Sequence, residues 1–319
     1  MGLRVAILDD YQGVALAAAP WHELGGDVEL TAFDDHVADD DALVARLAPF
    51  DVVVAMRERT PFTRARLERL PNLRLLVTTG MRNVAIDVGA ARDRGIAVSG
   101  TGGVSTATAE LTWALILALA RRVPAEDRDL REGGWQRTVG VDLAGRTLGV
   151  IGLGNQGGPV ARIGSAFGMR VIAWSRSLTA ERAAEHGAEA VERDVLLREA
   201  DVVTLHIPLS GRSRGLIGAP ELALMKPTAL LVNTSRGPIV DEAALAAALR
   251  EGTIAGAGVD VFETEPLPAQ HPLRDAPNTV LTPHIGYVTE ATYAVFYGEA
   301  VEDIAAWRDG TPVRVLEPR

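Results

Sequence analysis

The sequence predicts an α/β protein that contains two parallel β-sheets, each covered by helices. Short apolar runs rich in Val, Ile and Leu alternate with stretches of helical periodicity, which is typical of βαβ units. These runs fall into two series, separated by an alanine- and leucine-rich helical stretch at residues 105–122. A chain of 319 residues also exceeds the usual size of a single hydrophobic core. We therefore expect two domains.

The apolar runs mark the individual strands. The first series predicts strands at residues 3–8, 27–33, 51–56, 73–79 and 96–100, and the second predicts strands at residues 147–154, 170–175, 201–208, 229–235, 255–262 and 278–284. A second long helix is expected at residues 289–309. The final residues, 310–319, contain one glycine and two prolines and are expected to form an irregular tail.

Composition excludes several classes of function. The chain has 32 Lys and Arg against 42 Asp and Glu, with no basic stripe, which disfavours nucleic acid as a partner. The absence of cysteine excludes disulfides, thiolate nucleophiles and Cys-ligated metals, and it favours a cytoplasmic protein without a metal. No signal peptide is expected, because "MGLRVAILDD" soon becomes acidic. The apolar run 111–120 is too short to span a membrane, so we expect a buried or interface helix there.

A glycine-rich turn follows the first strand of the second series. Gly152, Gly154 and Gly157 form G-x-G-x-x-G between an apolar strand and a helical stretch, which is the context of a dinucleotide-binding turn. The first glycine permits the tight turn, the second lets the backbone approach a pyrophosphate, and the third allows close packing of helix on strand. Asn155 and Gln156 lie between the last two glycines and are further candidate cofactor ligands.

The next strand ends at Ser175 and Arg176, where a carboxylate would normally bind the ribose hydroxyls of NAD. The missing carboxylate removes a repulsion toward a 2′-phosphate, and an arginine can bind that phosphate by charge-assisted hydrogen bonds. The sequence therefore favours NADP(H) over NAD(H). The alternative is that Arg176 is a solvated surface residue and that NAD binds through other contacts.

Polar side chains follow three later strands of the second series. They are Arg236 after "LLVNTS", Glu265 in "VDVFETEPLP", and His284 in "LTPHIGY". Because the carboxyl ends of parallel strands meet at one edge of a sheet, these side chains can converge there. An arginine can grip a carboxylate, and an imidazole paired with a carboxylate can transfer a proton near neutral pH.

Taken together, these stretches resemble the D-isomer-specific 2-hydroxyacid dehydrogenases over nearly the whole chain. The matching segments are "VSTATAELTWALILALAR", "LAGRTLGVIGLGNQG", "DVVTLHIPLS", "LLVNTSRGPIVDEAALAAAL", "GVDVFETEPLP" and "LTPHIGY". The resemblance implies reduction of a 2-keto acid to a D-2-hydroxy acid. It assigns the acid/base role to His284, assistance of that histidine to Glu265, and binding of the substrate carboxylate and carbonyl to Arg236.

The resemblance also implies further site residues. Asp260 corresponds to the aspartate that binds the cofactor carboxamide. His206, Thr234 and Gly286 would line the nicotinamide or phosphate region. In the N-terminal domain, "TTGMRN" is similar to the loop whose amides face the substrate carboxylate, which points to Gly80 and Met81. Arg57, in "AMRERTPF", is either a further substrate ligand or a surface charge.

The family architecture implies a Rossmann nucleotide-binding domain inserted in a flavodoxin-like substrate domain. By that likeness residues 1–101 and 285–319 form the substrate domain, and residues 102–284 form the NAD(P)-binding domain. A homodimer built on the nucleotide-binding domains is also implied, and the run 111–120 fits such an interface. Two alternatives remain. One is a corepressor-like protein that senses dinucleotide, and the other is a formate dehydrogenase-like enzyme, in which glutamine replaces the residue at Glu265.

Overall fold

The computed structural model describes residues 2–318 and divides into two compact units. Unit 1 comprises Met1–Val104 and Val288–Arg319, and unit 2 comprises Ser105–Tyr287. The domain boundaries expected from the sequence, after residues 101 and 284, lie a few residues before these divisions. Each unit contains one sheet in which all strand pairs are parallel, so the predicted α/β class with two parallel-sheet domains is confirmed.

Unit 1 contains a five-stranded sheet in the order β2-β1-β3-β4-β5. The strands are β1 (Leu3–Ile7), β2 (Val28–Ala32), β3 (Val52–Ala55), β4 (Leu75–Thr78) and β5 (Ala97–Gly100). The strand order reverses between β1 and β3, and the carboxyl ends of strands at such a point are where open α/β sheets bind ligands. This order is that of flavodoxin-like sheets, as expected.

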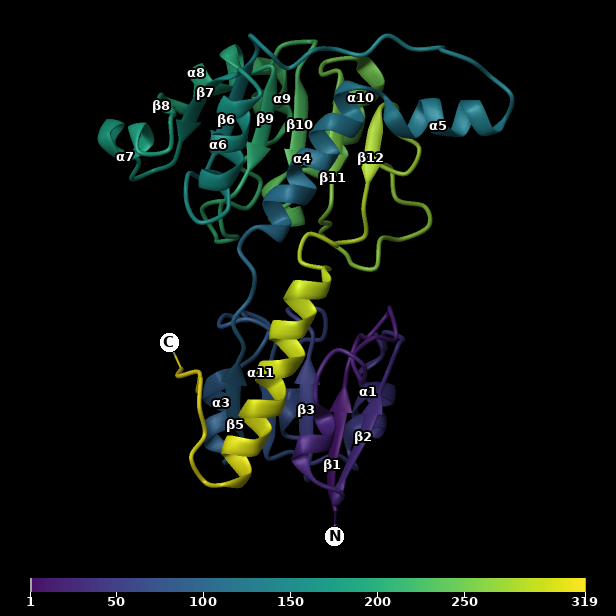
Figure 1. The fold of residues 1–319 in the computed structure, drawn as a ribbon, viewed down its shortest axis with the longest axis vertical. Helices are drawn as coiled ribbons and strands as arrows, with labels where there is room; N and C mark the ends of the chain where they lie inside the picture. The colour runs from purple at the N-terminus through teal and green to yellow at the C-terminus, as the bar shows by residue number, and fades with distance from the viewer. Residues whose placement is uncertain (1, 319) are drawn as a thin grey trace. The chain divides into compact units, whose positions relative to one another are not determined.

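Helices lie on both faces of the unit 1 sheet (Figure 1). The helices α1 (Asp40–Leu47), α2 (Arg64–Leu67) and α3 (Val88–Asp93) contribute Leu43, Leu67 and Ala90 to the core on one face. The 19-residue helix α11 (Glu290–Arg308) packs against β4, β5 and the short helix η1 (Trp21–Leu24). It begins where the Thr289 hydroxyl accepts a hydrogen bond from the Thr292 amide.

Unit 2 contains a seven-stranded sheet in the order β12-β11-β10-β9-β6-β7-β8. Its strands are β6 (Thr147–Ile151), β7 (Arg170–Trp174), β8 (Glu189–Ala190), β9 (Val202–Leu205), β10 (Leu230–Asn233), β11 (Gly256–Val259) and β12 (Thr279–Leu281). The first six strands of this series in chain order follow the Rossmann arrangement, with the reversal between β6 and β9. The predicted Rossmann architecture is therefore confirmed.

Two helical layers cover the sheet of unit 2 (Figure 1). The helices α8 (Arg193–Glu199), α9 (Ala219–Leu224) and α10 (Glu242–Glu251) pack on one face, with α7 (Ala180–Ala184) beside β8. The other face is covered by α4 (Ala107–Ala120) and α6 (Gly157–Ala166). Trp113, Leu115, Ile116 and Leu119 of α4 are buried in this core. The apolar run 111–120 is therefore mainly a core helix, as expected, and its use in a subunit interface stays a prediction.

Several short features were not expected from the sequence. The strand β8 has only two residues, and the helix α5 (Val123–Arg131) has no buried residue, so neither produces a hydrophobic signal. The strand expected at residues 147–154 ends earlier, because Gly152 turns the chain at φ +98°. The C-terminal tail is irregular, but it pairs with the edge strand β5, since the Leu316 amide donates to the Val98 carbonyl and the Gly100 amide to the Arg314 carbonyl. No helix within residues 2–318 is both long and apolar enough to cross a membrane.

Candidate active site

The candidate catalytic residues of unit 2 lie in the loops that follow three adjacent strands. The strands β10, β11 and β12 are neighbours in the sheet and run parallel (Figure 1). Arg236 follows β10, the segment from Asp260 to Glu265 follows β11, and His284 follows β12. Their loops therefore leave the same edge of one sheet, which is the edge at which open α/β sheets bind ligands.

A short contact in this group joins His284 to Glu265. The Nδ1 atom of His284 lies 2.6 Å from Oε2 of Glu265, and the two side chains are 17% and 24% exposed. Oε1 of Glu265 accepts a hydrogen bond from the Phe262 amide at 2.9 Å, which fixes the carboxylate. A carboxylate in this position orients the ring, because it binds the Nδ1 side and leaves the Nε2 side directed away from the carboxylate. This is the arrangement expected of a proton donor and its partner.

The backbone of His284 is strained. Its φ is +54°, a region that residues with a Cβ seldom adopt. Such strain persists only where the surroundings enforce it, and it is often found at functional sites. The enforcing group here is the buried Asp260. Its Oδ1 accepts from the Ile285 amide and the Thr282 hydroxyl, and its Oδ2 accepts from the Gly286 amide, all within 2.9 Å.

Asp260 has a structural task in unit 2. Both of its carboxylate oxygens accept hydrogen bonds from the protein on either side of His284, and its binding of the cofactor carboxamide stays a prediction. Burial raises its pKa, while the hydrogen bond from Thr282 opposes that shift. At Gly286, a Cβ would lie 3.1 Å from Oδ2 of Asp260, so the small residue permits this close packing. Asp260 anchors the loop that carries His284.

The loop of Arg236 is also held by side chains at the end of its strand. Asn233 donates from Nδ2 to the Arg236 carbonyl at 3.0 Å and accepts the Ser235 amide at 3.0 Å. The guanidinium of Arg236 is half-buried and donates to the Ser235 carbonyl at 2.7 Å. At Gly237, any Cβ would overlap the backbone of Phe262, which explains the glycine after the arginine. The Arg236 loop and the Glu265 loop are thus in direct backbone contact.

The glycine-rich turn fits a dinucleotide. At Gly152, a Cβ would lie 2.6 Å from the His206 carbonyl, and at Gly157 a Cβ would overlap the Gly152 carbonyl. Gly154, in contrast, has no heavy atom within 4 Å of the Cβ position, so its surface is open to a ligand. Gln156 precedes the ten-residue helix α6 without capping it through its side chain. Gly158 donates its amide to the Gly154 carbonyl at 2.8 Å and Pro159 has no amide, so the Gly157 amide is the candidate donor to an anionic group at this helix start.

The remaining cofactor candidates differ in their surroundings. Asn155 and Arg176 are exposed, Ser175 is half-buried, and Arg176 forms no hydrogen bond or ion pair with any residue between 2 and 318. Removal of water by the surrounding protein lowers the pKa of His206 to about 4, so its ring is neutral at physiological pH. The hydroxyl of the buried Thr234 lies 2.8 Å from that of Thr112 on α4. Thr234 thus joins its loop to α4.

In unit 1, Arg57 and the loop at Gly80 lie together. Arg57 follows β3 with φ +52°, and its Nη1 donates to the Thr79 carbonyl at 3.2 Å. A Cβ on Gly80, whose φ is +100°, would overlap this guanidinium. The Gly80 amide donates to the Thr101 hydroxyl at 2.9 Å, and the expected role of Gly80 in binding substrate stays a prediction. The Met81 amide has no acceptor among the described residues and remains the candidate donor of this loop.

Sequence reasoning missed several polar residues that support these loops. In unit 2, Glu242 at the start of α10 accepts from the Glu263 amide at 2.8 Å and pairs with His271 at 2.9 Å. In unit 1, the buried Asp9 pairs with His36 at 2.9 Å and accepts from the Thr60 hydroxyl at 2.8 Å. In the sequence, an acidic residue at a helix start or a histidine beside a proline gives little indication that it supports a functional loop. Only the tertiary contacts identify them.

Comparisons with known proteins agree with this geometry. Residues 113–286 match the family model of the D-isomer specific 2-hydroxyacid dehydrogenase, NAD binding domain. A glyoxylate reductase of Aeropyrum pernix is 48% identical over 254 residues, which cover 76% of each chain. A D-3-phosphoglycerate dehydrogenase of Archaeoglobus fulgidus is 38% identical over 85% of this chain, which spans 52% of that protein.

Solved structures give the same result. A putative D-3-phosphoglycerate dehydrogenase oxidoreductase from Ralstonia solanacearum has a TM-score of 0.94 and 38% identity, and the match covers 99% of this chain and 97% of that one. The fold and the matched family model therefore point to one known type of oxidoreductase with an NAD-binding domain. The chain is a member of the D-isomer specific 2-hydroxyacid dehydrogenase family.

Proposed function

We propose that this protein reduces a 2-keto acid to a D-2-hydroxy acid, and catalyses the reverse reaction, with His284 as the acid/base. The observation that carries the proposal is the 2.6 Å contact between His284 and Glu265. This contact lies at the sheet edge from which the Arg236 loop also leaves. When bound, the reduced nicotinamide supplies the hydride that adds to the carbonyl carbon. The protein must then deliver one proton to the carbonyl oxygen.

Each side chain has a defined part in this reaction. The His284 imidazolium donates its proton to the carbonyl oxygen as the hydride arrives, and solvent reprotonates the ring afterwards. Glu265 stabilises the protonated ring and holds its orientation. Arg236 binds the substrate carboxylate through paired hydrogen bonds and polarises the adjacent carbonyl. Asp260 keeps His284 in place through the Thr282, Ile285 and Gly286 contacts.

Unit 1 is proposed to supply anion-binding groups for the substrate. The Met81 amide and the Arg57 guanidinium are the candidates, because both belong to strand ends of the unit 1 sheet. Since relatives are named glyoxylate reductase and D-3-phosphoglycerate dehydrogenase, glyoxylate and 3-phosphohydroxypyruvate are the first substrates to compare. Glyoxylate has a single acidic group, whereas the second compound also carries a phosphate that Arg57 can bind.

The proposed cofactor is NADP(H) in preference to NAD(H). Arg176 supports this proposal because it is exposed, follows the strand that normally ends in the ribose-binding carboxylate, and has no carboxylate partner within residues 2–318. Ser175 removes the negative charge that would repel a 2′-phosphate. Asn155, Gln156 and the Gly157 amide at the start of α6 are the proposed pyrophosphate ligands.

The proposal is tested by an initial-rate assay of the purified protein with a panel of 2-keto acids, using NADPH and NADH in parallel. We expect turnover of at least one 2-keto acid, a preference for NADPH, and a product of D configuration on chiral chromatography. Binding of dinucleotide without turnover of any 2-keto acid would support a dinucleotide sensor instead. A formate-dependent reduction of the oxidised cofactor would support the formate dehydrogenase alternative.

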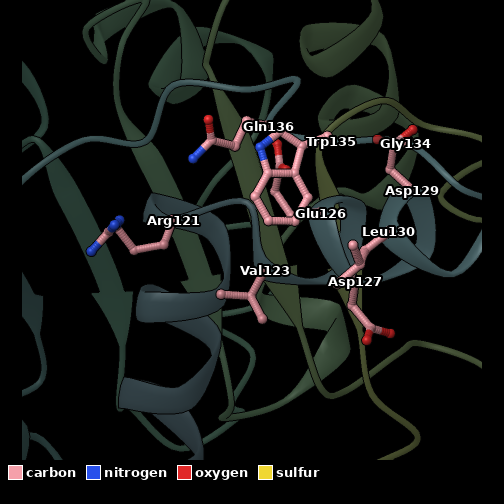
Figure 2. Close-up of a pocket in the computed structure, with 9 residues that line it drawn as sticks. All are labelled: Arg121, Val123, Glu126, Asp127, Asp129, Leu130, Gly134, Trp135 and Gln136. Atoms are coloured by element: carbon pink, nitrogen blue, oxygen red, sulfur yellow. The ribbon is translucent and has the colours of Figure 1, made fainter.

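We also propose that the protein forms a homodimer through unit 2. Trp135 is 74% exposed and Val139 is 93% exposed, and both lie in the segment that follows α5. Figure 2 shows the indole of Trp135 beside a hollow that Val123 and Leu130 of α5 also line. Apolar side chains exposed together in this way are typical of an interface. Light scattering should give about twice the 33.8 kDa mass of one chain.

A matched pair of variants tests where the dimer forms. Trp135→Glu should convert the protein to a monomer, because it places a charge at the centre of the proposed interface. Leu16→Glu changes a side chain that is 51% exposed in unit 1 and should leave the mass unchanged. A wild-type mass of one chain would contradict the homodimer, and a dimer that survives Trp135→Glu would contradict its placement at this segment.

A further inference from the structure

The position of Glu265 depends on the backbone of the loop that carries it. Its carboxylate is fixed by the Phe262 amide, three residues earlier in the same loop, at 2.9 Å. Any shift of Phe262 or Glu263 would therefore move the carboxylate relative to the His284 ring. The loop follows β11 and has no regular secondary structure of its own, so other groups must hold it. The structure contains such a group outside the proposed catalytic residues.

Glu242 is the group that meets this loop. It is the first residue of α10, and its side chain is 12% exposed. Its Oε1 accepts a hydrogen bond from the Glu263 amide at 2.8 Å. Its Oε2 lies 2.9 Å from Nε2 of His271. The Glu242 carboxylate thus contacts the loop that carries Glu265. Glu242 itself begins α10, the helix that follows the Arg236 loop in the chain.

His271 holds Glu242 in this orientation. Its ring is 15% exposed and packs edge-on against the Phe262 ring, with the centroids 6.3 Å apart. Its Nδ1 lies 3.4 Å from the Leu273 amide, which is consistent with Nε2 carrying the proton toward Glu242. His271 therefore contacts both Glu242 and the residue whose amide binds Glu265. The pair fixes the two ends of the segment from Phe262 to Leu273.

From these contacts, and given the proposed roles of His284 and Glu265, we propose that Glu242 is a positioning residue for Glu265 and that His271 supports it. Glu242 holds the Glu263 amide, the loop backbone holds the Glu265 carboxylate, and that carboxylate holds the His284 ring. Because the contact between the Gly237 and Phe262 backbones joins the same two loops, Glu242 also keeps Arg236 and Glu265 in register. Misplacing a catalytic group by a fraction of an ångström to one ångström can reduce turnover by up to about a hundredfold.

The same loop offers a matched control. The Glu263 side chain forms an ion pair with Arg214 at 2.8 Å, but both side chains are more than half exposed. Exposed ion pairs contribute little to the position of the backbone. Arg214→Ala therefore removes a contact to the residue that Glu242 binds, without removing the buried hydrogen bond. It should retain wild-type kinetics if the Glu242 contact is what positions the loop.

The test is a double-mutant cycle read out by the pH dependence of 2-keto acid reduction. Glu265→Ala should move the alkaline limb of kcat/KM to lower pH by about 1 unit, because the protonated His284 loses its carboxylate partner. Glu242→Ala should move the limb in the same direction and lower kcat roughly tenfold, with the KM for the cofactor unchanged. In the Glu265→Ala background, Glu242→Ala should add no further shift.

Conservative variants keep the test decisive if Glu242→Ala unfolds. Glu242→Gln retains an oxygen for the Glu263 amide and should restore most of the rate, whereas His271→Asn should produce a smaller shift in the same direction. A shift with Glu265→Ala but not with Glu242→Ala or His271→Asn would overturn this inference and leave the proposed function intact. An equal further shift in the Glu265→Ala background would also overturn it. An unchanged profile in Glu265→Ala would instead contradict the proposed role of Glu265.

Discussion

The two sheets of this protein use the carboxyl ends of their strands in different ways. In unit 2, His284 follows β12 with φ +54°, and in unit 1, Asp9 and Arg57 follow β1 and β3 with φ +57° and +52°. Each is a residue with a Cβ in a conformation that favours glycine. Both sheets therefore hold strained residues at the edge where α/β sheets bind ligands.

The difference lies in how each edge uses its carboxylates and histidines. In unit 2, the buried Asp260 holds the backbone around His284, and a second carboxylate, Glu265, contacts the ring itself. In unit 1, the buried Asp9 contacts both the His36 ring and the Thr60 hydroxyl, and the neighbouring buried Asp10 accepts hydrogen bonds from two amides of the next turn. The two carboxylates of unit 2 thus act on one histidine and its loop, whereas those of unit 1 hold separate segments of the chain. We infer that unit 2 performs the acid/base chemistry and that unit 1 positions the Arg57 guanidinium as an anion-binding group.

The largest effects should come from the unit 2 edge. His284→Ala and Arg236→Ala should each lower kcat/KM for 2-keto acid reduction by roughly a hundredfold or more, the scale of losing a proton donor or a charge clamp. Initial rates measure this effect, and the thermal midpoints should remain close to wild type since neither side chain is in a hydrophobic core. Near-normal turnover in either variant would break the assignment of chemistry to unit 2.

An intermediate effect is expected from Gly80→Ala in unit 1. The new Cβ would displace the Arg57 guanidinium, so the KM for an anionic 2-keto acid should rise roughly tenfold, by the loss of about one charge-assisted contact. The alkaline limb of the pH profile should stay in place, because unit 1 does not donate the proton. Gly13→Ala is the control, since Gly13 also has a positive φ of +64° but no heavy atom within 4 Å of the Cβ position. Equal KM changes in both variants would show strain and not displacement of Arg57.

A comparable but more selective effect is expected at Arg176. Arg176→Ala should raise the KM for NADPH roughly tenfold and leave the KM for NADH nearly unchanged, because only the former carries a 2′-phosphate. Arg182→Ala, an exposed arginine on α7 in the same unit, serves as a charge-matched control and should change neither value. If Arg176→Ala altered both cofactors equally, the inferred NADP preference would lose its physical basis.

The smallest effect concerns a buried carboxyl of unit 1 that should influence stability without influencing turnover. Burial raises the pKa of Asp303 on α11 to about 7, although Arg314 donates to it at 2.9 Å. A carboxyl whose folded pKa lies above its unfolded value of 3.8 binds more protons when folded. Its contribution to stability is therefore complete below about pH 4 and is lost as the pH rises through about 7.

Asp303→Asn should remove this dependence. The thermal midpoint of the variant should vary less than that of the wild type between pH 4 and 7, by a few degrees at most. Differential scanning calorimetry at several pH values measures the difference, and kcat should not change. A parallel dependence in both proteins would show that Asp303 does not titrate in this range.

Much of this arrangement could be predicted from the sequence, and the reasons are physical. Buried parallel strands are continuous apolar runs, so 11 of the 12 strands were expected, and only the two-residue β8 gave no pattern. The glycines of the dinucleotide-binding turn were recognised because steric constraints impose their spacing. Arg236, Glu265 and His284 were identified because the strand ends and the family resemblance pointed to the same residues.

The supporting contacts could not be predicted. Glu242 and His271 are 29 residues apart, and neither has a local signal that distinguishes it from a helix-start acid or a loop histidine. Asp260 was expected as a cofactor ligand, and only the contacts with Ile285 and Gly286 show that it anchors the His284 loop. The Gly80 amide was expected to face substrate, and the Thr101 hydroxyl that accepts it lies 21 residues away. Such tertiary hydrogen bonds leave little trace in a single sequence.

The most direct test of the central claim is the pH dependence of the reaction in both directions. If His284 is the single acid/base, kcat/KM for 2-keto acid reduction should fall as the pH rises, because the reaction needs the imidazolium, while kcat/KM for oxidation of the D-2-hydroxy acid should rise through the same pH interval. Both limbs should disappear in His284→Ala. Limbs that do not mirror each other, or that persist unchanged in the variant, would contradict the assignment of proton transfer to the unit 2 edge.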